Sequence, residues 1–462
     1  MRTPKLQYLY LQKPLVLLLL ITVISVCWIY KGDFYTKRDL RKASVAASMV
    51  EKNEWILPHV SANEIAYKPP FAYWLMAVFS LPQGSVSPFT ARLPSALAFV
   101  CLIGFSFLFF GRRLKGVESF LIPILLITSF GLHRAVMTTL IDMVLTTLIV
   151  LGLFSLFRWE EEKKLKGFPV IIPFILSLAT LTKGPVGIVL PLLVFGVYLL
   201  LLQYNFWKIS GKFILIALAA MVLPAIWYYL AYRQGGQAFL DLVWAKNFGR
   251  FLGGGFHISN FMTLIVGFIP WIILLFLSLF GLKYSFKIPA FKTICHNLLS
   301  MEKVKLFSLV SAIVIVLFYC IPVGKRSVSL MPAYPFIAVF MAQYIIYLTK
   351  HKPKITRIFS LIIGYMGVLM ALVILLAMVA HLVDPMQLFG FIKSERILSD
   401  IATVWSYFGT FNLLYVILLC ILLYTIYILF SQLRKKNNLK LLYATVGLYL
   451  AIFLTLDGIF FI

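Results

Sequence analysis

Long apolar runs recur along the whole chain and restrict the folds that it can adopt. A run of roughly 17–25 apolar residues can cross the hydrocarbon core of a bilayer as a helix. Residues 213–232 and 411–430 are two such runs, and neither contains a charged side chain. The runs do not alternate with period two, and open sheet edges cannot lie in lipid, so the spans are helices rather than barrel strands. We therefore predict an all-α polytopic membrane protein.

The composition agrees with a membrane domain. Hydrophobic residues make up 62% of the chain and charged residues 13%, whereas soluble domains have about 45–50% and about 25%. The five cysteines show no paired spacing, which argues against a disulfide framework and a thiolate zinc site. The net charge of +26 would suggest nucleic acid in a soluble protein. Here it is explained by basic residues that orient helices, so no nucleic-acid partner is predicted.

The apolar runs predict about thirteen transmembrane helices. They cover residues 15–30, 91–110, 121–132, 135–157, 168–181, 186–202, 213–232, 261–282, 306–321, 329–348, 358–381, 411–430 and 441–462. A further run at residues 71–81 is too short to span, and we predict a re-entrant or interfacial helix there. We expect a catalytic core over residues 1–349 and additional transmembrane helices over residues 350–462.

The distribution of basic residues predicts the orientation. With a cytoplasmic N-terminus, the cytoplasmic segments hold most of the 42 Lys and Arg residues, as the positive-inside rule requires. The outer loops are then residues 31–90, 233–260 and 382–410, together with short turns. The long first loop is expected to carry short juxtamembrane helices. Function concentrates on loops held by a rigid scaffold, so we expect the active site on this outer, periplasmic face.

Asp142 is a charged residue inside a predicted span, and such residues are costly in lipid and indicate function. It lies about two turns into the predicted helix over residues 135–157, roughly 10 Å from the outer end. The alternative explanation is a structural carboxylate that is neutralised by a neighbouring helix or a basic side chain.

Basic residues gather on the predicted outer face. The positive-inside rule, which orients the helices, requires few basic residues there. Arg contacts phosphate through two hydrogen bonds, and Lys presents a point charge. Beside a carboxylate such as Asp39 or Asp142, they predict a pocket for a lipid-phosphate leaving group with a general base. Solvated charges and snorkelling side chains are the alternative explanation. The basic residues are Arg38, Lys68, Lys183, Arg250, Lys325 and Arg326.

Several segments, taken in order, resemble the bacterial aminoarabinose-transferase-like and protein O-mannosyltransferase-like glycosyltransferases, which share the GT-C fold. The resemblance covers roughly residues 14–342. Its most specific marks are the KPP segment that follows Tyr67 and the lysine turn at residues 181–191. The other segments are MVEKNEWILPH from Met49, ARLPSALA from Ala91, DMVLT from Asp142, NFGRFLGG from Asn247 and KRSVSLMPAYP from Lys325.

The resemblance implies an enzyme of the bacterial inner membrane with a periplasmic active site. Its donor would be a sugar linked to undecaprenyl or dolichyl phosphate, transferred with inversion. The acceptor would be lipid A, another envelope glycan or a protein hydroxyl. Asp39 would act as the base, and Asp142 matches the acid of the DM motif. The residues expected to neutralise the donor phosphate are Lys68, Lys183 and Arg250, with Lys325 and Arg326 matching the last basic turn.

Four departures from the family pattern affect these expectations. Arg38 stands where the first of two acids is common, and Tyr67 replaces the Glu before the KPP lysine. Both are expected to line the substrate cavity. Residues 245–247 replace His and acidic residues, and Ser329 replaces a frequent Tyr. The residues that would bind a divalent metal in the family are therefore absent. No cofactor is predicted, but the use of a metal is not excluded.

Two alternative functions remain. A transporter or flippase of a lipid-linked sugar would need charged or broken helices through the whole membrane thickness, whereas the polar features here lie mainly on one face. A catalytically inactive family member that serves as an assembly partner would explain the missing family acids.

Overall fold

The computed structural model describes residues 4–34, 36–61, 64–247, 259–281, 298, 300–320, 327–380, 413–435 and 437–460. Helices dominate this part of the chain. The exception is a short antiparallel ribbon of β1 (His59–Ser61) and β2 (Glu64–Ile65), which the sequence did not predict. The prediction of an all-α polytopic membrane protein is confirmed.

The chain forms two compact units, residues 1–272 with 284–343 and residues 273–283 with 344–462. The predicted boundary after residue 349 stays a prediction. The second unit is built on α17 (Pro353–Ala380), α20 (Leu413–Arg434) and α21 (Asn438–Phe460), and α13 (Trp271–Gly281) and α16 (Tyr334–His351) contribute to both units. The first unit contains α1 (Pro4–Ser25), η1 (Cys27–Tyr30), α2 (Lys37–Glu51), α3 (Phe71–Ser80), η2 (Leu81–Gln83), α4 (Pro88–Gly111), α5 (Gly116–Ile127), α6 (Phe130–Met137), α7 (Ile141–Lys163), α8 (Ile171–Lys183), α9 (Val186–Leu201), α10 (Phe206–Asn247), α12 (Ser259–Gly267), α15 (Lys303–Cys320) and η3 (Ser327–Ala333).

Eight helices in the described part of the chain are long and apolar enough to cross a membrane. They are α4, α7, α10, α15, α16, α17, α20 and α21. The pair α5 and α6, bent by 47°, would make a ninth span. Shorter apolar helices, α1, α8, α9 and α13, occupy further predicted runs. The total of about thirteen spans therefore stays a prediction.

The structure places the breaks between α5, α6 and α7 differently from the sequence prediction. We expected an interruption around His133, but His133 is buried within α6. The chain instead breaks after Ile127, where the hydroxyl of Thr128 donates to the carbonyl of Ile124 at 2.7 Å. Such local hydrogen bonds of hydroxyl side chains compete with helix continuation.

A second break, at residues 138–140, corrects the position of Asp142. Thr138 has extended backbone angles (φ −115°, ψ 156°), and α7 begins only at Ile141. Asp142 consequently lies in the first turn of α7, so the prediction that it lies two turns inside a helix was wrong. The apolar pattern continues across the break, which is why hydropathy alone did not locate it.

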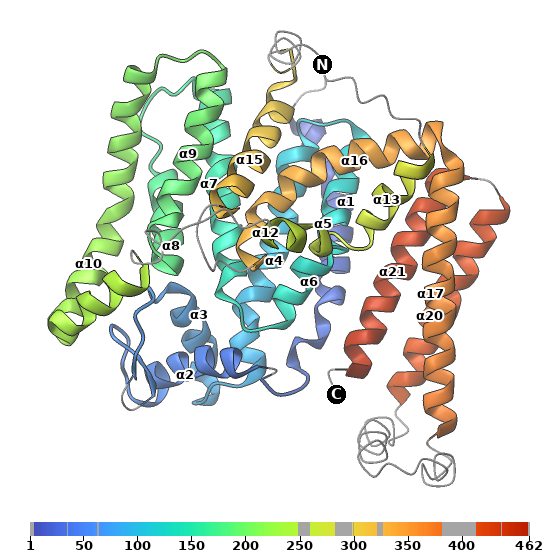
Figure 1. The fold of residues 1–462 in the computed structure, drawn as a ribbon, viewed down its shortest axis with the longest axis horizontal. Helices are drawn as coiled ribbons and strands as arrows, with labels where there is room; N and C mark the ends of the chain where they lie inside the picture. The colour runs from blue at the N-terminus through green and yellow to red at the C-terminus, as the bar shows by residue number, and fades with distance from the viewer. Residues whose placement is uncertain are drawn as a thin grey trace. The chain divides into compact units, whose positions relative to one another are not determined.

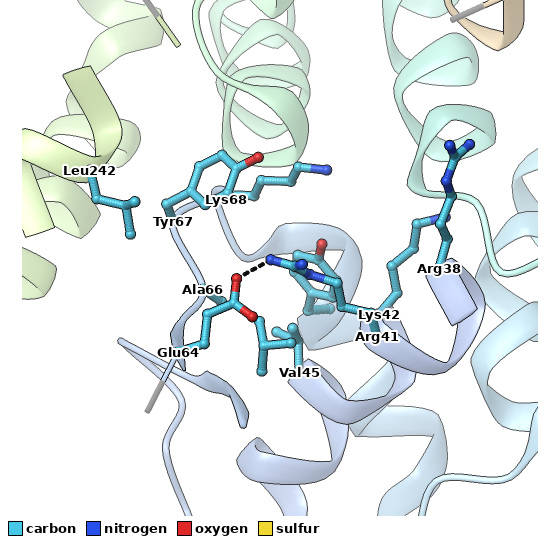
Figure 2. A pocket seen from close by; sticks show the side chains of 11 residues that line it. Arg38, Arg41, Lys42, Val45, Glu64, Ala66, Tyr67, Lys68 and Leu242 are labelled. Atoms are coloured by element: carbon cyan, nitrogen blue, oxygen red, sulfur yellow. Dashed lines mark hydrogen bonds and ion pairs between the residues drawn. The ribbon is translucent and has the colours of Figure 1, made fainter. Parts of the chain in front are cut away.

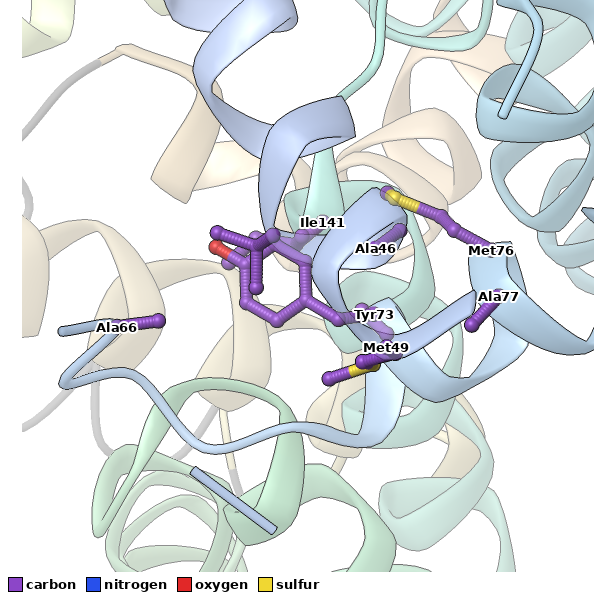
Figure 3. Packing of buried hydrophobic residues seen from close by; sticks show 9 residues of the cluster. Ala46, Met49, Ala66, Tyr73, Met76, Ala77 and Ile141 are labelled. Atoms are coloured by element: carbon purple, nitrogen blue, oxygen red, sulfur yellow. The ribbon is translucent and has the colours of Figure 1, made fainter. Parts of the chain in front are cut away.

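Two short helices from the long first loop, α2 and α3, pack against each other and against the helix ends at one end of the first unit (Figure 1). Figure 3 shows their shared core, in which Tyr73 and Met76 of α3 pack with Met49 of α2 and Ile141 of α7. Fully burying one such side chain stabilises the fold by about 1.5–3 kcal/mol. The core therefore fixes α2 and α3 on the start of α7, and the predicted juxtamembrane helices are confirmed.

A kink brings the end of α10 back toward the same loop. Gly236 has φ 58° and ψ −153°, a conformation that favours glycine. Beyond the kink, Phe239 packs with Leu57 and Trp227. The Trp227 indole N–H also donates to the carbonyl of Ile56 at 2.9 Å. The last part of α10 thus helps to enclose the region next to α2 and α3.

The tight turn between α8 and α9 depends on two glycines. Gly184 adopts φ 84°, which ends α8 directly after Lys183. A Cβ at Gly187 would overlap the backbone of Ala179 and Thr180. The close approach of α9 to α8 therefore fixes the position of Lys183.

We expect Gly187→Ala to lower the thermal stability of the detergent-solubilised protein, because overpacking costs about 1–3 kcal/mol. Gly211→Ala is the matched control, since a Cβ there meets nothing within 4 Å and alanine favours the helix. Unfolding followed by fluorescence measures both variants. Equal stability of the two would contradict the close packing of α8 and α9.

Candidate active site

Charged side chains from α2, α7 and α8 meet at the end of the first unit that α2 and α3 cover. The central contact is an ion pair in which Lys183 Nζ donates to the carboxylate of Asp142. Lys183 Nζ also donates to Ser329 Oγ of η3 at 3.1 Å. The side chains of Lys183 and Asp142 are 29% and 13% exposed, so the pair is largely shielded from solvent.

Both partners lie where the helix dipole favours their charge. An acid is stabilised near a helix N-terminus and a base near a C-terminus, each by typically 0.3–1 kcal/mol. Asp142 lies in the first turn of α7, and Lys183 is the last residue of α8. Local structure therefore supports this ion pair from both sides.

Lys42 of α2 connects the two candidate carboxylates. Its ammonium donates to the Thr139 carbonyl at 2.5 Å, just before α7, and lies 3.9 Å from the Asp39 carboxylate. The charges of Lys42 and Lys68 also act on Asp142. Lys42 is 7% exposed. The Thr139 carbonyl and the Asp39 carboxylate supply acceptors that a buried ammonium group requires.

Asp39 lies in the first turn of α2, and Thr36 is the N-cap of this helix. The Thr36 hydroxyl accepts a hydrogen bond from the Asp39 backbone N–H at 3.2 Å and donates to the Asp39 carboxylate at 2.9 Å. Asp39 is only 2% exposed. The carboxylate thus has a structural role at the helix start, in addition to its place beside Lys42.

A cavity of about 410 Å³ opens between α2, α3 and the segment before α3. Figure 2 shows Tyr67 and Lys68 on one side and Arg41 and Lys42 of α2 facing them. Arg41 forms an ion pair with Glu64, the acidic residue of the lining. The lining is Arg38, Arg41, Lys42, Val45, Val60, Glu64, Ala66, Tyr67, Lys68, Tyr73 and Leu242. Four bases against one paired acid make this cavity, named here the cationic cavity, suited to an anion.

A second cavity of about 450 Å³ shares Arg38 with the first. Asp39 and Arg134 contribute to its wall, together with apolar residues of α6, α12 and η3. Gly267 lies directly against the Tyr334 hydroxyl, where a Cβ would overlap it. Arg38 therefore stands between two cavities of comparable size, and Asp39 faces the second one.

The structure brings together part of the predicted site. Lys68, Lys183 and Asp142 are close enough to interact electrostatically. Tyr67 and Arg38 line the cationic cavity, and Asp39 lines the second one. Arg250, Lys325 and Arg326 lie outside the described residues. The roles of all these residues remain predictions.

Sequence reasoning missed Lys42, Tyr73 and Arg134, which line the two cavities. Lys42 follows Asp39 by three residues, a spacing that places both on one helix face. This spacing could have indicated Lys42. Nothing in the local sequence indicated Arg134, because its position depends on how α6 packs.

In the described part of the chain, no three His, Cys, Asp or Glu residues are grouped for a metal ion. Tyr67 occupies the position beside Lys68 where an acidic ligand was expected.

Comparison with known proteins identifies the class to which this architecture belongs. The structure superimposes on the crystal structure of ArnT from Cupriavidus metallidurans bound to undecaprenyl phosphate, with a TM-score of 0.68 and 18% identity. The match covers 96% of this chain and 76% of that one. The fold is therefore that of a polytopic GT-C membrane protein, as the sequence predicted.

The sequence comparisons define the family. A model of the dolichyl-phosphate-mannose-protein mannosyltransferase family matches residues 67–229. An uncharacterised protein of Aquifex aeolicus is 30% identical over 329 residues, covering 69% of this chain and 70% of that protein. The undecaprenyl phosphate-alpha-4-amino-4-deoxy-L-arabinose arabinosyl transferase of Edwardsiella ictaluri is 24% identical, covering 81% of this chain and 67% of that protein. The chain belongs to the aminoarabinose-transferase-like and protein mannosyltransferase-like family of glycosyltransferases.

We expect Lys183→Met to destabilise the protein by about 1.5–3 kcal/mol, the usual contribution of a hydrogen bond to a charged group. The double variant Asp142→Asn with Lys183→Met should recover part of this loss, because it leaves no unpaired charge. Thermal unfolding of both variants in detergent measures the effect. A double variant less stable than the single one would contradict the ion pair.

Proposed function

We propose that the protein transfers a sugar from a polyprenyl-phosphate donor, undecaprenyl phosphate in a bacterium, to an acceptor outside the cytoplasmic membrane. The observation that carries the proposal is the cationic cavity next to the Asp142 and Lys183 pair. Lys68 and Lys42 supply charge for a phosphate, and both act on the nearby carboxylate. The names of the similar proteins support a polyprenyl-phosphate donor.

The proposed reaction is a single displacement with inversion at the anomeric carbon. The acceptor hydroxyl oxygen attacks that carbon and forms the new C–O bond. The bond between the carbon and the phosphate oxygen breaks, and its electron pair leaves with the polyprenyl phosphate. A carboxylate, Asp39 or Asp142, takes the acceptor proton, while the basic side chains stabilise the negative charge on the departing phosphate.

The remaining predicted phosphate ligands belong to the same proposal. Arg250, Lys325 and Arg326 match the family motifs, and we assign them to the donor phosphate together with Lys68 and Lys183. We also propose how the protein is oriented in the inner membrane. Its N-terminus is cytoplasmic, and the cationic cavity lies on the periplasmic side. The proposed acceptor is lipid A, another envelope glycan or a protein hydroxyl.

Lys68→Ala tests donor binding. A charge-assisted hydrogen bond contributes about 1.5–3 kcal/mol, so we expect the dissociation constant of undecaprenyl phosphate to rise about tenfold or more. Lys52→Ala is the matched control, because Lys52 is an exposed lysine that follows α2 and does not line the cavity. Native mass spectrometry of the detergent-solubilised protein measures both. Equal affinities of the two variants would argue against the cationic cavity as the donor site.

Asp39→Asn and Asp142→Asn test the base. Because the amide cannot accept the acceptor proton in the same way, we expect transfer to fall 10²-fold or more, in the range of about 10²–10⁴ for general base catalysis. Sugar transfer to membrane acceptors from a labelled polyprenyl-phosphate donor provides the measurement.

An active wild type with both variants fully active would show that the base lies elsewhere. Movement of the donor across the membrane without transfer would favour the flippase. A wild type that binds the donor and neither transfers nor moves it would favour the inactive relative.

A further inference from the structure

Tyr73 is a buried tyrosine that lines the cationic cavity. It is the third residue of α3 and is 3% exposed, with its ring packed in the core between α2, α3 and α7. Figure 3 shows the hydroxyl at the end of the ring that points away from Met49 and Met76. Tyr73 also belongs to the lining of the cationic cavity. The ring is therefore a core residue, and only its polar end reaches the cavity.

The Tyr73 hydroxyl forms no hydrogen bond with any other described residue. A tyrosine hydroxyl can donate one hydrogen bond and accept others. Phenylalanine would fill the same apolar volume but would offer no donor at the cavity wall. Because the Tyr73 side chain lines the cationic cavity, its hydroxyl can donate to a molecule that occupies the cavity.

The surroundings of the hydroxyl define the chemistry of that partner. The cavity presents Arg38, Arg41, Lys42 and Lys68, and its acid, Glu64, is paired with Arg41. Such a lining takes an anion with several acceptor oxygens. Burial, the phenol of Tyr67 and the negative charge of Asp142 raise the pKa of the Tyr73 phenol, and Arg41 opposes them. The phenol is therefore neutral at physiological pH and presents an O–H donor.

We propose that the Tyr73 hydroxyl donates a hydrogen bond to a phosphate oxygen of the polyprenyl-phosphate donor, beside the ammonium group of Lys68. This inference rests on the proposed function and adds a binding residue to it. Lysine gives the phosphate charge without strong directionality. The hydroxyl, held by the packed ring, adds a directed donor that fixes how the phosphate lies in the cavity.

Tyr73→Phe tests the proposal because it removes one oxygen atom and leaves the ring. We expect the dissociation constant of undecaprenyl phosphate to rise about tenfold, as for a hydrogen bond to a charged group. Thermal stability should stay equal or increase, since no hydrogen bond within the described protein is lost. Binding of undecaprenol, which lacks the phosphate, should not change. Native mass spectrometry with the two lipids supplies the affinities.

Tyr198→Phe is the matched control. Tyr198 is also fully buried, and its hydroxyl also lacks a partner among the described residues, but it does not line the cationic cavity. This variant should bind undecaprenyl phosphate as the wild type does. It separates the effect of the cavity from the general effect of removing a buried hydroxyl.

Several results would overturn the inference. If Tyr73→Phe binds undecaprenyl phosphate as tightly as the wild type, the hydroxyl does not contact the phosphate, even if transfer falls. Equal weakening by Tyr198→Phe, or equal weakening for undecaprenol, would point to a change in packing instead. A wild type that does not bind undecaprenyl phosphate would overturn the proposed function itself and the inference with it.

Discussion

The ion pair between Asp142 and Lys183 is the contact on which the arrangement of the first unit's charged end depends. It joins the start of α7 to the end of α8, where both helix dipoles favour the charges. Lys42 fixes α2 to the same place through the Thr139 carbonyl. With these contacts made, the bases of α2 and the KPP segment face one cavity. A polar centre is thereby built at helix ends, which avoids the cost of charges in the middle of a span.

Most of the fold followed from the apolar pattern, because twenty-residue hydrophobic segments have few alternatives to helices in lipid. The short helix α3 was also foreseen from the length of its apolar run. The breaks around α6 were not, because they depend on hydroxyl groups and backbone angles at Thr128 and Thr138 rather than on hydropathy. The position of Asp142 changed with them, from inside a helix to its first turn.

The candidate site was predictable only in part. A lysine at the tip of a tight turn and one before two prolines were recognisable locally, and the structure brings Lys183 and Lys68 to the same carboxylate. Lys42 and Tyr73 were not recognised, since their importance comes from packing between elements that are distant in sequence. Its hydrogen bonds with Thr36, the N-cap of α2, give Asp39 a structural role in addition to its proposed chemistry.

The cationic cavity is proposed to hold the phosphate of a polyprenyl-phosphate donor. The most direct measurement is an experimental structure of the protein in lipid nanodiscs with undecaprenyl phosphate bound. We expect the phosphate inside the cavity between α2 and the KPP segment, with oxygen atoms about 2.7–3.2 Å from Lys68 Nζ. A phosphate seated elsewhere, for example beside Lys303 and Glu160 at the other end of α7, would contradict it.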